Sequence, residues 1–116
     1  MTRPTARLRT LLNVVTLLLA GAAPAGAEAV ATPDIHFDGR RFSPAQVAIP
    51  AGQPTMLRVT NDSGVTIEFE SFALHREKLV TPGNTGLVRL PPLDPGHYDF
   101  FDDFHAEVPK GIITAQ

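Results

Sequence analysis

Apolar and polar residues alternate in short stretches along the last two thirds of the chain, and proline or glycine separates most of these stretches. Side chains two positions apart share one face of a strand, so this alternation is typical of strands with one buried face. The stretches lie at residues 35–37, 46–49, 56–60, 67–70, 87–90, 98–101 and 112–115. The pattern predicts an all-β fold, a Greek-key β-sandwich of seven or eight strands.

The same alternation predicts which side chains form the core. The predicted core residues are Ile35, Phe37, Val47, Ile49, Leu57, Val59, Ile67, Phe69, Leu87, Phe100 and Ile112. They are enough for one small domain and no more.

The first 27 residues have the composition of an export signal. Three arginines precede an apolar run at residues 11–23, and Ala25-Gly26-Ala27 has the small-x-small pattern of a cleavage site. We therefore expect a signal peptide at residues 1–27, a domain at residues 28–116 and a periplasmic location. The apolar run is short for a membrane span, but an uncleaved tether is the alternative.

Charge and cysteine content narrow the possible functions. The chain has a net charge of −2, and cleavage after Ala27 would leave seven Lys and Arg against twelve Asp and Glu. An acidic exported domain does not suit nucleic-acid binding. The sequence contains no cysteine, which excludes disulfides, thiolate catalysis and thiolate metal ligands.

Two acidic side chains share one face of a predicted strand. Glu68 and Glu70 alternate with Ile67 and Phe69, so the carboxylates point one way and the apolar groups point the other. Neighbouring carboxylates repel each other, and a cation between them would remove that repulsion. The alternative interpretation is the solvated face of an edge strand.

A second segment contains a tyrosine, acidic residues and a histidine in close succession. Tyr98 follows the Pro95-Gly96 turn in the manner of a tyrosine corner, and the strand ends at Asp102-Asp103-Phe104-His105. This segment resembles the cupredoxin loop Tyr-x-Phe-x-Cys-x-x-His. The resemblance puts Asp102 at the cysteine and His105 at the histidine, whereas Pro109 replaces the usual methionine. A blue-copper centre, which needs the thiolate, is therefore not expected.

The matching glycine of that family is Gly111, and Asn61 matches the asparagine that precedes its upstream histidine. The segments around Glu68 and His105 also resemble the small periplasmic cupredoxin component of bacterial iron-uptake systems. That resemblance implies an Fe or Cu ion as cofactor, and a membrane iron permease or periplasmic iron-uptake component as partner. It implies assistance to iron uptake, by ferrous-iron oxidation or by handover to the permease.

The candidate metal ligands are Glu68, Glu70, Asp102 and His105. His105 can instead cap the strand by bonding a backbone group, and Asp102 and Asp103 should point to opposite sides. Residues 76–78 are interpreted as a charged loop. Asp34, His36 and Asp38 on one strand form a possible secondary metal site.

The alternative function is a metal-free β-sandwich that binds another protein. No catalytic residues are assigned, because the sequence has no recognisable nucleophile and base in a cleft.

Overall fold

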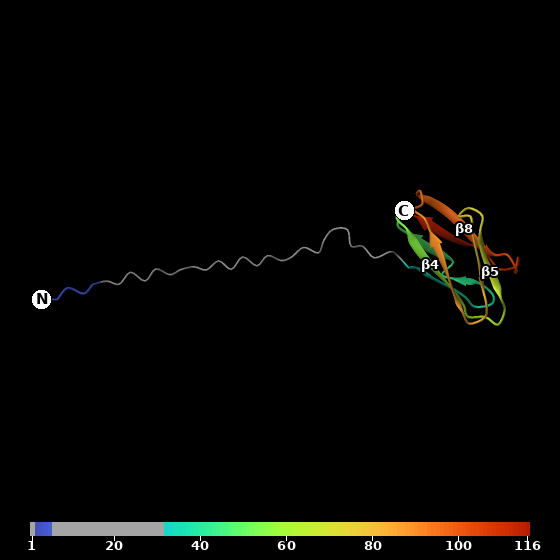
Figure 1. The fold of residues 1–116 in the computed structure, drawn as a ribbon, viewed down its shortest axis with the longest axis horizontal. Helices are drawn as coiled ribbons and strands as arrows, with labels where there is room; N and C mark the ends of the chain where they lie inside the picture. The colour runs from blue at the N-terminus through green and yellow to red at the C-terminus, as the bar shows by residue number, and fades with distance from the viewer. Residues whose placement is uncertain (1, 6–31) are drawn as a thin grey trace.

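The protein is described by a computed structural model that covers residues 2–5 and 32–116 (Figure 1). The predicted signal peptide, residues 1–27, lies largely outside these described residues. The strands are β1 (Asp34–Phe37), β2 (Phe42–Ser43), β3 (Gln46–Ile49), β4 (Thr55–Asn61), β5 (Ile67–Ser71), β6 (Arg76–Val80), β7 (Thr85–Leu90), β8 (Gly96–Asp102) and β9 (Gly111–Ala115). The described part of the chain contains no helix long and apolar enough to cross a membrane.

Within residues 32–116, nine strands form two sheets that pack face to face, which confirms the predicted β-sandwich. One sheet has the order β2-β1-β4-β7, and the other has the order β3-β9-β8-β5-β6. β1 pairs with β4 and β3 pairs with β9 in parallel, whereas the other pairs are antiparallel. Figure 1 shows β4 on one side of the domain and β5 and β8 on the other.

The core lies between the sheets and is built from the alternate side chains of each strand. Phe37, Phe69 and Phe100 are fully buried, and Phe100 packs between Phe42 and Phe69 with ring centroids 5.2 Å from each. These three are the largest of the fully buried side chains, so each removes a large apolar area from water.

The prediction that Leu87 and Ile112 belong to the core is wrong. Leu87 is 52% exposed, because Gly86, Val88 and Leu90 are the residues of β7 that face inward. Ile112 is only partly buried, because Ile113 and its alternate neighbours face the core from β9. A run of consecutive apolar residues does not reveal which of two adjacent positions faces inward.

The structure also contains two strands that the sequence did not predict. β2 has only two residues, too few for a periodic signal. β6 replaces the expected charged loop at residues 76–78, and all of its side chains except Val80 are at least partly exposed. As the edge strand of its sheet, β6 carries charges in the way that edge strands commonly do.

Two polar residues fix the connections that bring the candidate site together. The buried amide of Asn61 donates to the carbonyls of Val65 and Val80 at 2.6 and 2.9 Å, and so holds the β4–β5 connection against β6. The Tyr98 hydroxyl donates to the carbonyl of Asp94 at 2.8 Å, the bond expected of a tyrosine corner.

Candidate metal site

The outer face of the five-stranded sheet carries a cluster of carboxylates on β5 and β6. Glu68 and Glu70 alternate along β5 with the buried Ile67 and Phe69, as predicted. In the antiparallel pairing of the two strands, Glu70 lies directly opposite Glu77. Ligand oxygens of these three glutamates lie within 4.8 Å of one another.

Glu77 was not among the predicted ligands, because residues 76–78 were interpreted as a loop. The tight turn between β5 and β6, in which His75 has a positive φ of 53°, folds β6 back along β5. A hairpin centred on residues 72–75 would have predicted the pairing of Glu70 with Glu77. The turn residues are not the Asn-Gly or Asp-Gly pairs that mark hairpins in a sequence.

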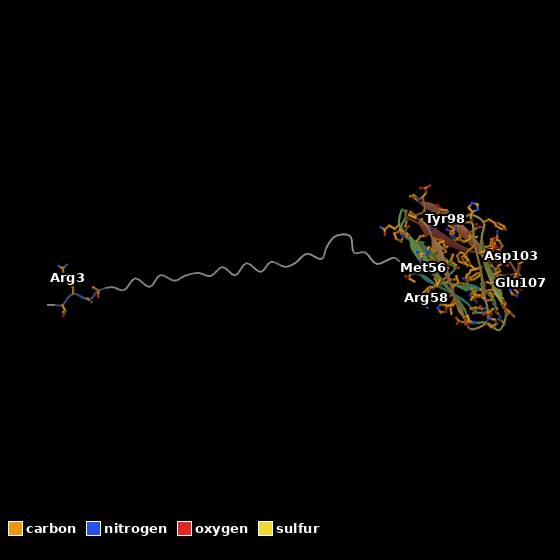
Figure 2. The ribbon with its side chains drawn as sticks, in the orientation of Figure 1. Arg3, Met56, Arg58, Tyr98, Asp103 and Glu107 are labelled. Carbon is orange, nitrogen blue, oxygen red and sulfur yellow. The ribbon has the colours of Figure 1, made fainter. Side chains whose placement is uncertain are left out.

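Asp103 adds a fourth carboxylate next to this cluster. Its backbone N–H donates to the carbonyl of Glu68 at 2.9 Å, which fixes the start of the loop after β8 beside β5. Figure 2 shows Asp103 near Glu107 at one end of the domain, while Tyr98 lies farther back along β8. Asp102 is buried and Asp103 is exposed, so the prediction that they point to opposite sides is confirmed.

The electrostatic environment of the cluster disfavours three charged glutamates without a counter-ion. Desolvation raises the pKa of Glu68, and the neighbouring carboxyl of Glu77 raises it further. Desolvation likewise raises the pKa of Glu70, followed by the charges of Glu77 and Glu68. Like charges directly opposite each other on a sheet destabilise it, and a bound cation would reverse that effect.

The surface at the cluster is slightly hollowed. A depression of about 280 Å³ is lined by Glu68, Glu77, Lys78 and Leu79. Its carboxylates offer oxygen ligands only, the set that hard cations prefer.

Asp102 and His105 do not join this cluster. Asp102 is 1% exposed, and its Oδ1 accepts hydrogen bonds from the backbone N–H groups of Glu68 and Phe104 at 3.1 and 3.0 Å. Its Oδ2 bonds Nδ1 of His105 at 2.5 Å. Both oxygens of the Asp102 carboxylate are thus already used inside the protein.

His105 keeps one ring nitrogen available. Its ring stacks on Phe37 with centroids 6.5 Å apart, and Asp102 bonds its Nδ1. Nε2 has no hydrogen-bond partner among the described residues. A carboxylate that bonds one histidine nitrogen commonly orients the other toward a ligand. The arrangement suits His105 as a single ligand that Asp102 positions.

The four predicted ligands therefore fall into two separate groups. Glu68 and Glu70 lie on the outer face with Glu77, whereas Asp102 and His105 lie at the end of the domain, between β5 and the loop after β8. The possible secondary site does not form, because His36 bonds Asp62 at 2.7 Å and Asp34 bonds Arg58 at 2.8 Å.

A cupredoxin copper centre does not fit the residues at the corresponding position. The cysteine position of the cupredoxin loop is Asp102, whose carboxylate is hydrogen-bonded to three protein groups. The chain has no cysteine to supply a thiolate. Blue-copper chemistry depends on that copper–thiolate bond, so this chain cannot form such a centre.

Comparison with known proteins places the chain in a family. A cupredoxin-like domain family matches residues 10–115, so the chain belongs to the cupredoxin-like domain proteins. An uncharacterized protein of Rickettsia prowazekii (strain Madrid E) is 40% identical over 79 residues. That match covers 68% of this chain and 63% of the relative, so this chain spans less than two thirds of the relative's length.

Solved structures share the fold at low sequence identity. An auracyanin from Roseiflexus castenholzii has a TM-score of 0.64 at 16% identity, over 77% of this chain and 99% of its own. Auracyanin A from Chloroflexus aurantiacus, a "blue" copper protein, has a TM-score of 0.62 at 14% identity, over 76% of this chain and all of its own. These similarities support the cupredoxin-like fold.

Proposed function

We infer that this protein binds a metal ion through the carboxylates on the outer face of its sheet. The observation that carries this inference is the group of Glu68, Glu70 and Glu77, with ligand oxygens within 4.8 Å of one another. Two of these carboxyls have raised pKa values because of desolvation and mutual repulsion. A cation lowers the free energy of such a cluster by neutralising it.

The ligand chemistry is compatible with iron and copper among the cations that oxygen ligands bind. Carboxylate oxygens suit Fe(II), Fe(III), Mn(II) and Cu(II), and an anionic oxygen set stabilises Fe(III) more than Fe(II). Copper is the metal of the blue auracyanin that shares this fold. We propose a role for the exported protein in iron uptake. Either each bound Fe(II) gives one electron to an external acceptor such as dioxygen and becomes Fe(III), or the protein passes iron to a membrane permease.

The test is isothermal titration of the metal-stripped protein with Cu(II) and, without oxygen, with Fe(II). We expect saturable one-to-one binding that weakens by at least about tenfold in Glu68→Gln, which removes one ligand charge while keeping the side-chain shape. Asp94→Asn is the matched control, because Asp94 precedes β8 whereas the cluster lies near its other end. Equal affinity in Glu68→Gln and in the wild type would refute the proposed site.

A second candidate function is supported by apolar side chains beside the carboxylates. Phe72 is 69% exposed and contacts the ring of Phe101, which pairs with Glu70 across β5 and β8. Leu79 is 58% exposed opposite Glu68. A partner protein with basic and apolar groups would cover this surface. Absence of saturable binding for either metal would favour this interaction module.

A further inference from the structure

A second pocket is formed by the turn between β1 and β2 together with the segments that precede β3 and β9. It has a volume of about 430 Å³ and is lined by Arg40, Arg41, Phe42, Ala45, Pro109 and Lys110. β3, which follows Ala45, is one edge strand of that sheet, and β6 with Glu77 is the other. The lining therefore contains three cationic side chains and no carboxylate, although the chain as a whole has a net charge of −2.

The turn between β1 and β2 presents the two arginines to this pocket. Oδ1 of Asp38 accepts hydrogen bonds from the backbone N–H groups of Arg40 and Arg41, at 2.8 and 2.9 Å. These two bonds fix the turn. These hydrogen bonds lower the pKa of Asp38, which favours the charged carboxylate that accepts them. Among the described residues, neither guanidinium group forms an ion pair.

The remaining walls are rigid and largely apolar. Phe42 is 2% exposed and packs edge-on against Phe100. The carbonyl of Ala45 accepts a hydrogen bond from the N–H of Ile112 at 2.8 Å. Lys110 lies over the ring of Phe101 at 5.4 Å from its centroid, and its Nζ is 3.6 Å from Asp99. Phe101 and Asp99 on β8 therefore position the lysine side chain. At this distance its ion pair with Asp99 is weak.

We propose that this pocket binds a small multivalent oxyanion, a polycarboxylate or a phosphate. A guanidinium group presents a planar fork of N–H donors that matches carboxylate and phosphate oxygens, and two adjacent arginines offer two such forks. A third cation makes a multivalent anion a better match for the pocket than a monovalent one. The rigid turn and the buried Phe42 reduce the ordering that binding requires.

The proposal is tested by isothermal titration of the metal-stripped protein with citrate, with phosphate and with acetate. We expect saturable one-to-one binding of citrate, of phosphate or of both, at least about tenfold tighter than that of acetate and weakened by added salt. The stronger of the two multivalent anions identifies the ligand class. Saturable acetate binding of equal affinity would overturn the assignment to a multivalent ligand.

Substitutions locate the binding on the protein. Arg41→Gln should weaken binding by at least about tenfold, and Arg41→Lys should retain part of it, because the charge remains while the fork is lost. Arg89→Gln removes the same charge from β7, at the far edge of the other sheet, and should leave the affinity unchanged. Thermal unfolding of each variant verifies that the fold is intact.

Three further results would overturn the proposal. One is the absence of saturable binding for both multivalent anions, and another is equal loss of binding in Arg41→Gln and Arg89→Gln. The third is self-association that Arg41→Gln abolishes and citrate does not displace, because it would assign the pocket to carboxylates of a second copy of the chain.

Discussion

Glu70 faces two other carboxylates of the cluster. It lies opposite Glu77 across β5 and β6 and two positions from Glu68 on its own strand. Desolvation raises its pKa above the ordinary value of 4.5, and the charges of Glu77 and Glu68 raise it further. Ionising this side chain therefore costs the folded protein more than it costs the unfolded chain.

This raised pKa predicts how a substitution changes stability with pH. The metal-free wild type should lose stability as the pH rises from 4.5 through the raised pKa, because the folded state prefers the protonated carboxyl. Glu70→Gln reduces that loss, so its melting temperature should exceed that of the wild type at neutral pH. The two melting temperatures should converge below pH 4.5. Differential scanning calorimetry at both pH values measures the difference.

Asp94→Asn provides the control for this effect, since it neutralises a carboxylate away from the cluster. Its melting temperature should follow that of the wild type at both pH values. A Glu70→Gln variant that is less stable than the wild type at neutral pH, with metal removed, would contradict the repulsion argument.

Asp102 shows why only half of the candidate site could be predicted from the sequence. Alternation along one strand was enough to place Glu68 and Glu70 on one face. The loop resemblance was enough to place Asp102 and His105 near each other, and their side chains do bond. The resemblance could not show that Asp102 also accepts a hydrogen bond from the backbone N–H of Glu68, which lies on another strand. That contact spans 34 positions of the chain and depends on the register of β5 against β8.

Gly111 illustrates how one element of the fold depends on its neighbour. β9 begins at this residue, which pairs with Phe100 on β8. A Cβ atom at Gly111 would lie 2.1 Å from Cζ of Phe100, far inside van der Waals contact. The Phe100 ring is held between Phe42 and Phe69 and cannot move aside easily.

Gly111→Ala should therefore lower the free energy of unfolding by about 3 kcal/mol, the upper part of the range for overpacked cores. Gly64→Ala is the matched control, because nothing lies within 4 Å of a Cβ atom there. Its effect should stay below about 1 kcal/mol. Urea denaturation monitored by circular dichroism measures both.

A second variant separates steric overlap from a backbone effect. Phe100→Leu combined with Gly111→Ala should cost less than the sum of the two single substitutions, since the smaller side chain makes room for the added methyl group. Additive losses, or a Gly111→Ala variant within about 0.5 kcal/mol of the wild type, would contradict this account.

The elements predicted from the sequence are those whose pattern has a period of two. β1, β3, β4 and β5 begin and end within one residue of the predicted stretches. β6 was missed because its core contact is limited to Val80 at one end, so its sequence resembles a loop. Its position is determined by pairing with β5, and that pairing is also what brings Glu77 to the site.

At the scale of the whole molecule, the two proposed binding surfaces lie near the two edges of one sheet. Carboxylates gather on β5 and β6, and the lining of the second pocket next to β3 is cationic. The two proposed ligands have opposite charge and would bind at opposite edges of the same sheet. The sites share no lining residue, so a variant of one should leave the other unchanged.

Export would determine whether the full chain or the shorter chain of residues 28–116 presents these two surfaces. Cleavage after Ala27 would remove three arginines and change the net charge from −2 to −5, which makes the protein a better ligand for cations. It would leave every described strand intact, because β1 begins at Asp34. We expect the protein recovered from the periplasmic fraction of an expressing Gram-negative host to have the intact mass of residues 28–116.

Substitutions at the cleavage site provide the control for this expectation. Ala27→Arg should block processing, because the peptidase requires a small residue there, whereas Ala27→Ser should be processed normally. Recovery of the full 116-residue chain from the membrane fraction would instead support the uncleaved tether. In that case the domain would act beside the membrane, and direct handover of iron to a permease would become the favoured form of the proposed function over soluble iron capture.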